Sequence, residues 1–436
     1  MSQAPQPPWL DVDRLIDDRR TRVIVCCGSG GVGKTTTAAA IGLRAAERGR
    51  HVVVITVDPA RRLAQSMGLS SLDNTPRLVP MAAQPSAGTG RKTQQHNETS
   101  QGSLHAMMLD MKRTFDEIVE AHADPDRAAQ ILANPFYQSL SSSFAGTQEY
   151  MAMEKLGQLR RADEWDLIVV DTPPSRSALD FLDAPQRLGR FLDGRLLRLL
   201  TSPAKLGGRA YLRVLGAGFG MITGILTKIL GAQVLRDAQT FVAALDTMFG
   251  GFRERADYTY QLLRAPGTAF LVIAAPEPDA LREASYFVER LAQEGMPLAG
   301  LILNRVHNSP PARLSAARSL AAAETLQAAE ARQAAAAPRA SGRGGTGTGT
   351  AASHPGTGEN GARVLAIAAL RLHAERKAQA ATERRVAEHF TTAHPLVPVT
   401  EVPAQAEDVH DLAGLRAIGR SFGSESYGSE SYGSES

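Results

Sequence analysis

The chain has 436 residues, and its 48 lysines and arginines nearly balance 45 aspartates and glutamates, for a formal net charge of +3. This balance excludes a strongly basic nucleic-acid coat or an acidic tail protein, and 5% aromatic residues leave few platforms for stacking on nucleic-acid bases. The two cysteines, Cys26 and Cys27, are adjacent, which excludes a disulfide framework and a cysteine-based zinc site within one chain. We expect a cytoplasmic protein with no nucleic-acid partner.

Short apolar runs alternate with longer helical patterns along the chain. The runs predict buried strands at Val23–Cys27, Val52–Val57, Met107–Leu109, Leu167–Val170, Ala269–Ala274, Leu301–Leu303 and Val397–Val402. A helix is predicted from Lys34 to Arg48, ending at Gly49. Continuous apolar strands separated by helices indicate an α/β fold, with a mostly parallel P-loop sheet, helices on both faces and an inserted helical subdomain.

The first predicted strand leads directly into a glycine-rich loop and then the helix. The loop reads Gly28-Ser29-Gly30-Gly31-Val32-Gly33-Lys34-Thr35-Thr36, which is G-x-x-x-x-G-K-[ST] in its strand–loop–helix context. Its glycines let backbone N–H groups surround phosphate oxygens, and the helix N-terminus adds partial positive charge. We expect Lys34 to contact the β- and γ-phosphates and Thr35 to bind Mg²⁺. The alternative is a glycine-rich turn without a ligand.

Two aspartates follow predicted strands. Asp58 comes directly after the second strand, where it can orient a water towards the γ-phosphate. The alternative for Asp58 is a helix N-cap before Pro59. Asp171 ends a later apolar strand, which is typical of a Walker B aspartate that contacts Mg²⁺, and the alternative is a simple strand-end cap.

The late strand at Leu301–Leu303 indicates which base the nucleotide carries. It continues into Asn304-Arg305 and lacks the aspartate of the Asn-Lys-x-Asp motif that is typical of GTP-binding proteins. The Asn304 amide offers a donor and an acceptor to the N6/N7 edge of adenine. The sequence therefore favours ATP over GTP.

Three segments resemble motifs of the ArsA/tail-anchored-protein-targeting ATPase family, in the deviant-Walker P-loop group that also holds the MinD and ParA proteins. They are GSGGVGKTTTAAA at 28–40, TVDPARRLA at 56–64 and DTPPSRSALDFLD at 171–183. The resemblance is closest to the actinobacterial "anion-transporting ATPase" branch. It implies a dimeric ATPase that closes around two ATP molecules, with Asp58 as the catalytic switch I residue and Asp171 as the switch II residue. It also implies that Asn304 and Pro403 lie on the adenine side.

The chain departs from the family pattern in its phosphate loop and its cysteines. The family's loop carries a signature lysine that reaches the partner subunit's phosphates, and here that position is Ser29. Losing one such contact costs roughly 3–4 kcal/mol. Either a homodimer hydrolyses ATP slowly, or a paralogous ATPase subunit supplies the lysine in a heterodimer and this chain is a catalytically weak regulatory subunit. The cysteines of the family's zinc and arsenite sites are also missing, so we interpret Cys26 and Cys27 as buried core residues.

Composition and motif order divide the chain into regions. They are an N-terminal lead (1–20), the first part of the ATPase domain (21–111) with a disordered insertion (84–103), a helical insertion (112–163), a core segment with switch II (164–180), a helical client or partner subdomain (181–262), the last part of the core (263–420) with a second disordered insertion (334–362), and a disordered GSESY tail (421–436). The segments predicted as disordered cannot bury enough apolar surface to offset chain entropy.

The subdomain at 181–262 is the expected contact for a client. Apolar residues from Leu212 to Ile229 recur at spacings of three and four, which predicts one apolar stripe on a helix. The stripe either packs inside the subdomain or forms part of a groove for a hydrophobic protein client, which is what the family resemblance implies. The longest apolar run, Val214–Thr227, is shorter than the roughly 20 residues of a membrane span, so we expect at most peripheral contact with a membrane or a membrane-protein partner.

Overall fold

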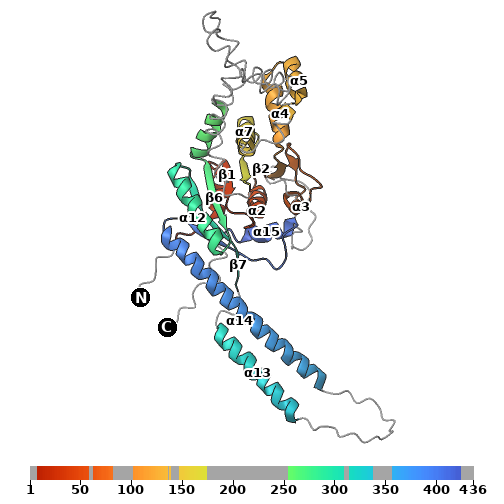
Figure 1. Cartoon of the computed structure of the whole chain (residues 1–436), viewed down its shortest axis with the longest axis vertical. Coiled ribbons are helices and arrows are strands. Elements are labelled where there is room, and N and C mark those ends of the chain that lie inside the picture. The colour runs from red at the N-terminus through yellow and green to blue at the C-terminus, as the bar shows by residue number, and fades with distance from the viewer. Residues whose placement is uncertain are drawn as a thin grey trace, which may run out of the picture.

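The computed structural model describes residues 7–57, 62–81, 102–135, 137–138, 147–173, 254–308, 314–336 and 356–423. Its centre is an eight-stranded sheet in the order β3-β4-β2-β5-β1-β6-β7-β8 (Figure 1). The strands are β1 (Val23–Cys27), β2 (His51–Thr56), β3 (Arg77–Leu78), β4 (Ser103–Met108), β5 (Leu167–Asp171), β6 (Thr268–Ala274), β7 (Leu298–Val306) and β8 (Val399–Pro403). Neighbouring strands are parallel except β3 and β4. The predicted α/β fold with a mostly parallel sheet is confirmed.

The sheet separates two hydrophobic cores, because successive side chains of each strand point to opposite faces. In β1, Val25 and Cys27 belong to one core and Ile24 and Cys26 to the other. The Val25 face is covered by α4 (Met111–His122), α5 (Pro125–Ala133), α7 (Thr147–Ala162) and α12 (Pro278–Gln293). The Ile24 face is covered by α1 (Val12–Asp17), α2 (Lys34–Glu47), α3 (Arg62–Ser66) and α15 (Leu412–Arg420).

All seven predicted strands are present, with ends that differ by a few residues. The sequence patterns missed β3, an edge strand of two exposed residues that pairs antiparallel with β4. It carries no apolar run, and only its partner strand gives it an extended conformation.

Residues 7–20 of the N-terminal lead are described and pack against the rest of the fold. Val12 and Ile16 of α1 are fully buried, and Asp13 forms an ion pair with Arg44 of α2 at 2.5 Å. Trp9, which precedes α1, forms an isolated parallel bridge with Val399, the first residue of β8. Amphipathic spacing in a single short helix was too weak a signal to predict this from sequence.

Two long helices form a hairpin that extends away from the sheet (Figure 1). They are α13 (Ala316–Ala336) and α14 (Gly356–Ala393), and the buried side chain of His373 on α14 contacts the carbonyl oxygen of Leu314 at 2.9 Å. Both ends of the segment predicted as disordered, 334–362, are therefore helical, while 337–355 lies outside the described residues. The N-terminal end is an alanine run with high helix propensity, whereas the C-terminal end, 356–362, carries three glycines and is helical as the first turns of α14. Each long helix gives the other a packing partner.

The described residues of 112–163 include α5, α7 and all but the first residue of α4. Most of the predicted client subdomain, including the stripe from Leu212 to Ile229, lies outside the described residues, and so do the tail from 424 onward and most of 84–103. None of the helices in the described ranges combines the length and apolar character that a membrane crossing requires.

Candidate nucleotide-binding site

The glycine-rich loop lies between β1 and α2, and two of its glycines are fixed by close neighbours. Gly33 has a φ of 92° and precedes the first residue of α2. A Cβ on Gly33 would lie 2.3 Å from Nδ2 of Asn304, and a Cβ on Gly28 would lie 2.1 Å from the carbonyl oxygen of Ile273. Larger residues would displace β6 or β7, so the loop's curl depends on glycine at both positions.

The loop is open to solvent on one side. Gly30 and Gly31 are exposed, and a Cβ on Gly31 would meet nothing within 4 Å. Val32 is buried and fastens the loop to the Ile24 core. An anion can therefore approach the N-terminus of α2 from the side of Gly31, where the helix carries partial positive charge.

Lys34, the first residue of α2, lies against this loop. Its side chain is buried, at 5% exposure, and its Nζ donates a hydrogen bond to the carbonyl oxygen of Ser29 at 2.7 Å. The ammonium group is thus held over the loop, within reach of a phosphate that replaces this carbonyl as its acceptor.

Asp171 joins the ends of β5 and β2 to the first turn of α2. Its side chain is fully buried at the end of β5, and its Oδ2 accepts hydrogen bonds from the hydroxyls of Thr35 at 2.7 Å and Thr56 at 2.8 Å. Thr35 comes from the phosphate loop and Thr56 from the end of β2. Parallel pairing of β5 with β1 and β2 produces this convergence.

The two cysteines of β1 lie next to this cluster, and their thiols are unreactive. Burial raises the pKa of Cys27 to about 12. Burial, followed by the charge of Asp171, raises the pKa of Cys26 well above its usual value. Both thiols therefore stay protonated at neutral pH, and the prediction that they are buried core residues is confirmed.

Asn304 contacts the phosphate loop directly. It is buried near the end of β7, and its Nδ2 donates to the carbonyl oxygen of Val32 at 2.8 Å. The next residue, Arg305, has a φ of 63°, where β7 shifts register against β8. Pro403 ends β8 beside Val306, so both residues predicted on the adenine side lie at the same end of neighbouring strands.

Asp58, the predicted catalytic aspartate, lies outside the described residues. The last described residue before it, Val57, donates its backbone N–H to the carbonyl oxygen of Asp171 at 3.2 Å. Thr36 lies half-buried in the first turn of α2.

Sequence reasoning missed Thr56 and the bulge at Arg305. A hydroxyl residue that ends an otherwise aliphatic strand, two positions before Asp58, was the available signal for Thr56. No sequence signal marks the bulge, because a positive φ at arginine is set by the register between β7 and β8.

A cavity of about 380 Å³ adjoins the loop on the side of Ser29. Three acidic residues of the β6–α12 connection and of α12 line it: Glu277, Asp279 and Glu283. Its other walls are the loop itself, from Ser29 to Val32, and two alanines. The position that carries the signature lysine in the resembling family therefore faces an acidic hollow in this chain.

Comparison with known proteins identifies the site's family. The sequence model of the anion-transporting ATPases, ArsA_ATPase, matches residues 21–333. The chain belongs to this family. It is an ATPase, and its glycine-rich loop lies within the matched region.

Curated relatives agree with this assignment at low identity. ATPase GET3 of Malassezia globosa is 24% identical over 309 residues, which cover 70% of this chain and 78% of the relative. ATPase get3 of Schizosaccharomyces pombe is 23% identical over 310 residues, covering 71% and 80%. ATPase ARSA2 of Chlamydomonas reinhardtii is 24% identical over 306 residues, covering 70% and 73%.

Proposed function

We propose that this ArsA-family ATPase hydrolyses ATP with Mg²⁺ as a dimer, and that opening and closing of the dimer is coupled to a hydrophobic protein client or a membrane-protein partner. The observation that carries the chemical part is the convergence of Lys34, Thr35 and Asp171 at one end of the sheet. The dimer and the client rest on the family resemblance and on the apolar stripe of the sequence at 212–229.

The residues of the candidate site have the chemistry needed to bind both Mg²⁺ and the phosphates of ATP. Thr35 and Thr56 each donate their hydrogen to Asp171, so the hydroxyl oxygen of Thr35 keeps its lone pairs for a metal ion. Hydroxyl and carboxylate oxygens are the ligand type that Mg²⁺ prefers. When bound, Mg²⁺ would neutralise charge on the phosphates; the residues that would hold it are Thr35 and, through water, Asp171.

The roles of the other residues follow from their positions. Lys34 would contact the β- and γ-phosphates, and backbone N–H groups from Gly28 to Thr36 would surround the phosphate oxygens. Asp58 would orient the attacking water. Asn304 already donates to Val32 through Nδ2, which leaves its amide oxygen as an acceptor for the N6 amine of adenine. Pro403 would pack at the adenine side.

Two substitutions test this assignment in the full chain. Lys34→Ala and Asp58→Asn should each abolish ATP hydrolysis with the fold intact, as judged by circular dichroism and thermal unfolding. Asp58→Asn should still bind ATP, because its role is in positioning water. Sedimentation velocity with and without a non-hydrolysable ATP analogue measures whether the chain forms a dimer. A monomer in both conditions would refute the proposed dimer.

Ser29 favours a second candidate function, a catalytically weak ATP-binding subunit that regulates a paralogous partner in a heterodimer. The acidic cavity beside Ser29 would suit a lysine or arginine that enters from another subunit. ATP turnover of the isolated chain and of the chain co-expressed with a paralogue separates the two functions. If the isolated chain turns over as fast as any mixture, the regulatory subunit is ruled out.

The proposed location is the cytoplasm, with peripheral contact at a membrane when a client is delivered. Fractionation of cells that express the tagged chain tests this proposal. Membrane-bound chain should be released by salt or carbonate and not require detergent.

A further inference from the structure

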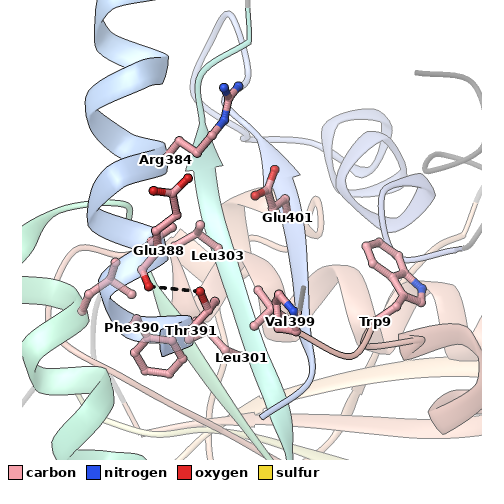
Figure 2. Close-up of a pocket in the computed structure, with 12 residues that line it drawn as sticks. Trp9, Leu301, Leu303, Arg384, Glu388, Phe390, Thr391, Val399 and Glu401 are labelled. Atoms are coloured by element: carbon pink, nitrogen blue, oxygen red, sulfur yellow. Dashed lines mark hydrogen bonds between the residues drawn. The ribbon is translucent and has the colours of Figure 1, made fainter. Parts of the chain in front are cut away.

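A second cavity lies away from the nucleotide site, on the opposite face of β7. Its volume is about 460 Å³, within the range of roughly 300–1,000 Å³ that is typical of small-molecule sites. Leu301 and Leu303 of β7 form its floor (Figure 2). Phe390 of α14 lies on one side, and Trp9 and Val399 of β8 lie on the other.

The cavity has an apolar end and a charged end. Figure 2 shows Arg384, Glu388 and Glu401 gathered at one end, with Phe390 and Val399 towards the other. Within the described part of the chain, no ion pair at 4.0 Å or less joins any of these three charged side chains to another residue. Two carboxylates against one guanidinium leave the charged end with excess negative charge.

Glu401 is the carboxylate that β8 contributes to the cavity. Its side chain is exposed to solvent where it lines the cavity, so a charged ligand can reach it there. Burial raises the pKa of Glu401, Arg384 lowers it, and Glu383 raises it again. A bound cation beside Glu401 would favour its ionised form and compensate for this environment.

We propose that this cavity binds a small amphipathic amine, with its apolar body between Trp9 and Phe390 and its ammonium group beside Glu401. The site is independent of the proposed ATPase mechanism. Only Leu281, Leu301 and Leu303 of its lining lie inside the region 21–333 that matches the family. The remaining walls come from the N-terminal segment, α14 and β8, which the family match does not include.

Trp9 provides the measurement. The chain has two tryptophans, and the other, Trp165, stacks edge-on against His105 with ring centroids 4.8 Å apart, outside the cavity lining. In full-length Trp165→Phe, Trp9 is the remaining tryptophan. Titration with 4-phenylbutylamine should give a saturable change in Trp9 fluorescence and a matching heat by calorimetry. The isosteric probes 4-phenylbutanol and 4-phenylbutyrate should bind at least tenfold more weakly, because they lack the ammonium group.

Three variants in this background locate the site. Glu401→Gln should weaken amine binding at least tenfold without changing affinity for the alcohol. Ala387→Phe should abolish binding of all three probes by filling the cavity. Glu407→Gln, which changes an exposed carboxylate outside the lining, is the matched control and should bind like the parent. Absence of amine binding by both methods, equal affinity for amine and alcohol, or unchanged amine affinity in Glu401→Gln would overturn the proposal.

Discussion

Thr56 is the residue whose substitution most directly tests the proposed metal site. Its hydroxyl and that of Thr35 donate to the same oxygen of Asp171, at 2.8 and 2.7 Å. In Thr56→Val the shape of the side chain is kept and one of these donors is lost. A hydrogen bond to a charged group contributes about 1.5–3 kcal/mol. Loss of a residue that orients a metal ligand typically weakens metal binding by about 10- to 100-fold.

The assay follows Mg²⁺ affinity in the presence of a fluorescent, non-hydrolysable ATP analogue. Thr56→Val should raise the dissociation constant for Mg²⁺ by about 10- to 100-fold. Nucleotide affinity measured in EDTA should change less than threefold, because Thr56 holds the carboxylate and not the phosphates. Thr56→Ser restores the hydroxyl and should recover most of the loss. Equal losses with and without Mg²⁺ would show that Thr56 supports the fold of the loop, and an unchanged Mg²⁺ affinity would refute its role at the metal.

Three further predictions concern the loop, the N-terminal lead and the cysteines. Gly33→Ala should reduce nucleotide affinity at least tenfold in equilibrium binding, because its φ of 92° is strained for alanine and its Cβ would meet Asn304. Arg50→Lys should lower the free energy of unfolding by about 2–4 kcal/mol in urea titrations, because the buried guanidinium donates to four separate backbone carbonyls that one ammonium cannot reach together. Cys26 and Cys27 should react with a thiol reagent only after denaturation, since both are buried and protonated; rapid labelling of native protein would contradict this.

The fold was largely predictable because its strands are apolar on both faces. β1, β5 and β6 are buried along their full length, so their sequences appear as continuous aliphatic runs. β3 was not predictable, because its two residues are exposed and its conformation comes from pairing with β4. The helical ends of the insertion at 334–362 were not predictable, because the stretch between them is glycine-rich and the first turns of α14 carry three glycines themselves.

The candidate site was predictable where the functional residues belong to one contiguous sequence motif that also sets the backbone conformation. The motif from Gly28 to Thr36 predicts the conformation of its own backbone. Asp171 could be predicted because it stands at the end of an apolar strand. The contact between Asn304 and Val32 joins residues 272 positions apart, so no local pattern contains it. Thr56 shares that difficulty, since its partner Asp171 is 115 positions away.

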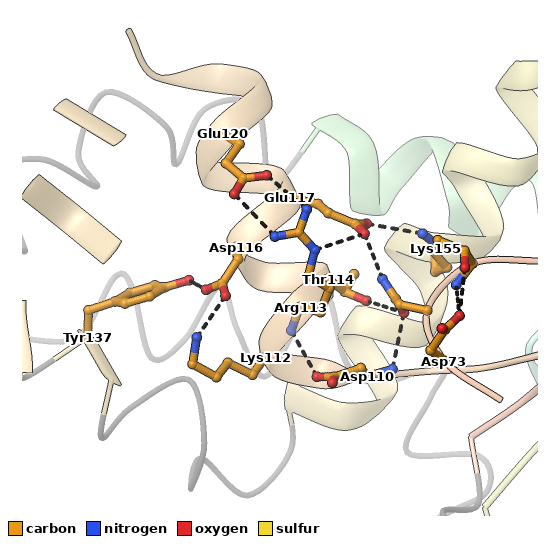
Figure 3. A network of polar contacts seen from close by, with 12 residues as sticks. Asp73, Asp110, Lys112, Arg113, Thr114, Asp116, Glu117, Glu120, Tyr137 and Lys155 are labelled. Atoms are coloured by element: carbon orange, nitrogen blue, oxygen red, sulfur yellow. Dashed lines mark hydrogen bonds and ion pairs between the residues drawn. The ribbon is translucent and has the colours of Figure 1, made fainter. Parts of the chain in front are cut away.

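A polar network holds α4 against neighbouring elements, and none of its residues belongs to the candidate nucleotide-binding site (Figure 3). Glu117 accepts from Asn74 at 3.0 Å and from Lys155 of α7 at 3.0 Å, while Asp110 caps the helix. These contacts join the connection after α3 to α4 and α7.

The end of β7 links the candidate nucleotide site to α14. Asn304 holds the phosphate loop, and three residues later His307 is held by Glu383 of α14 through both its backbone N–H, at 2.9 Å, and its ring, at 2.7 Å. The left-handed Arg305 lies between them, so the chain changes direction over one residue. A displacement of Asn304 on nucleotide binding would therefore act on α14 through a short, doubly anchored segment. Because α14 carries the hairpin away from the sheet, it is the described element best placed to transmit the state of the loop to a partner.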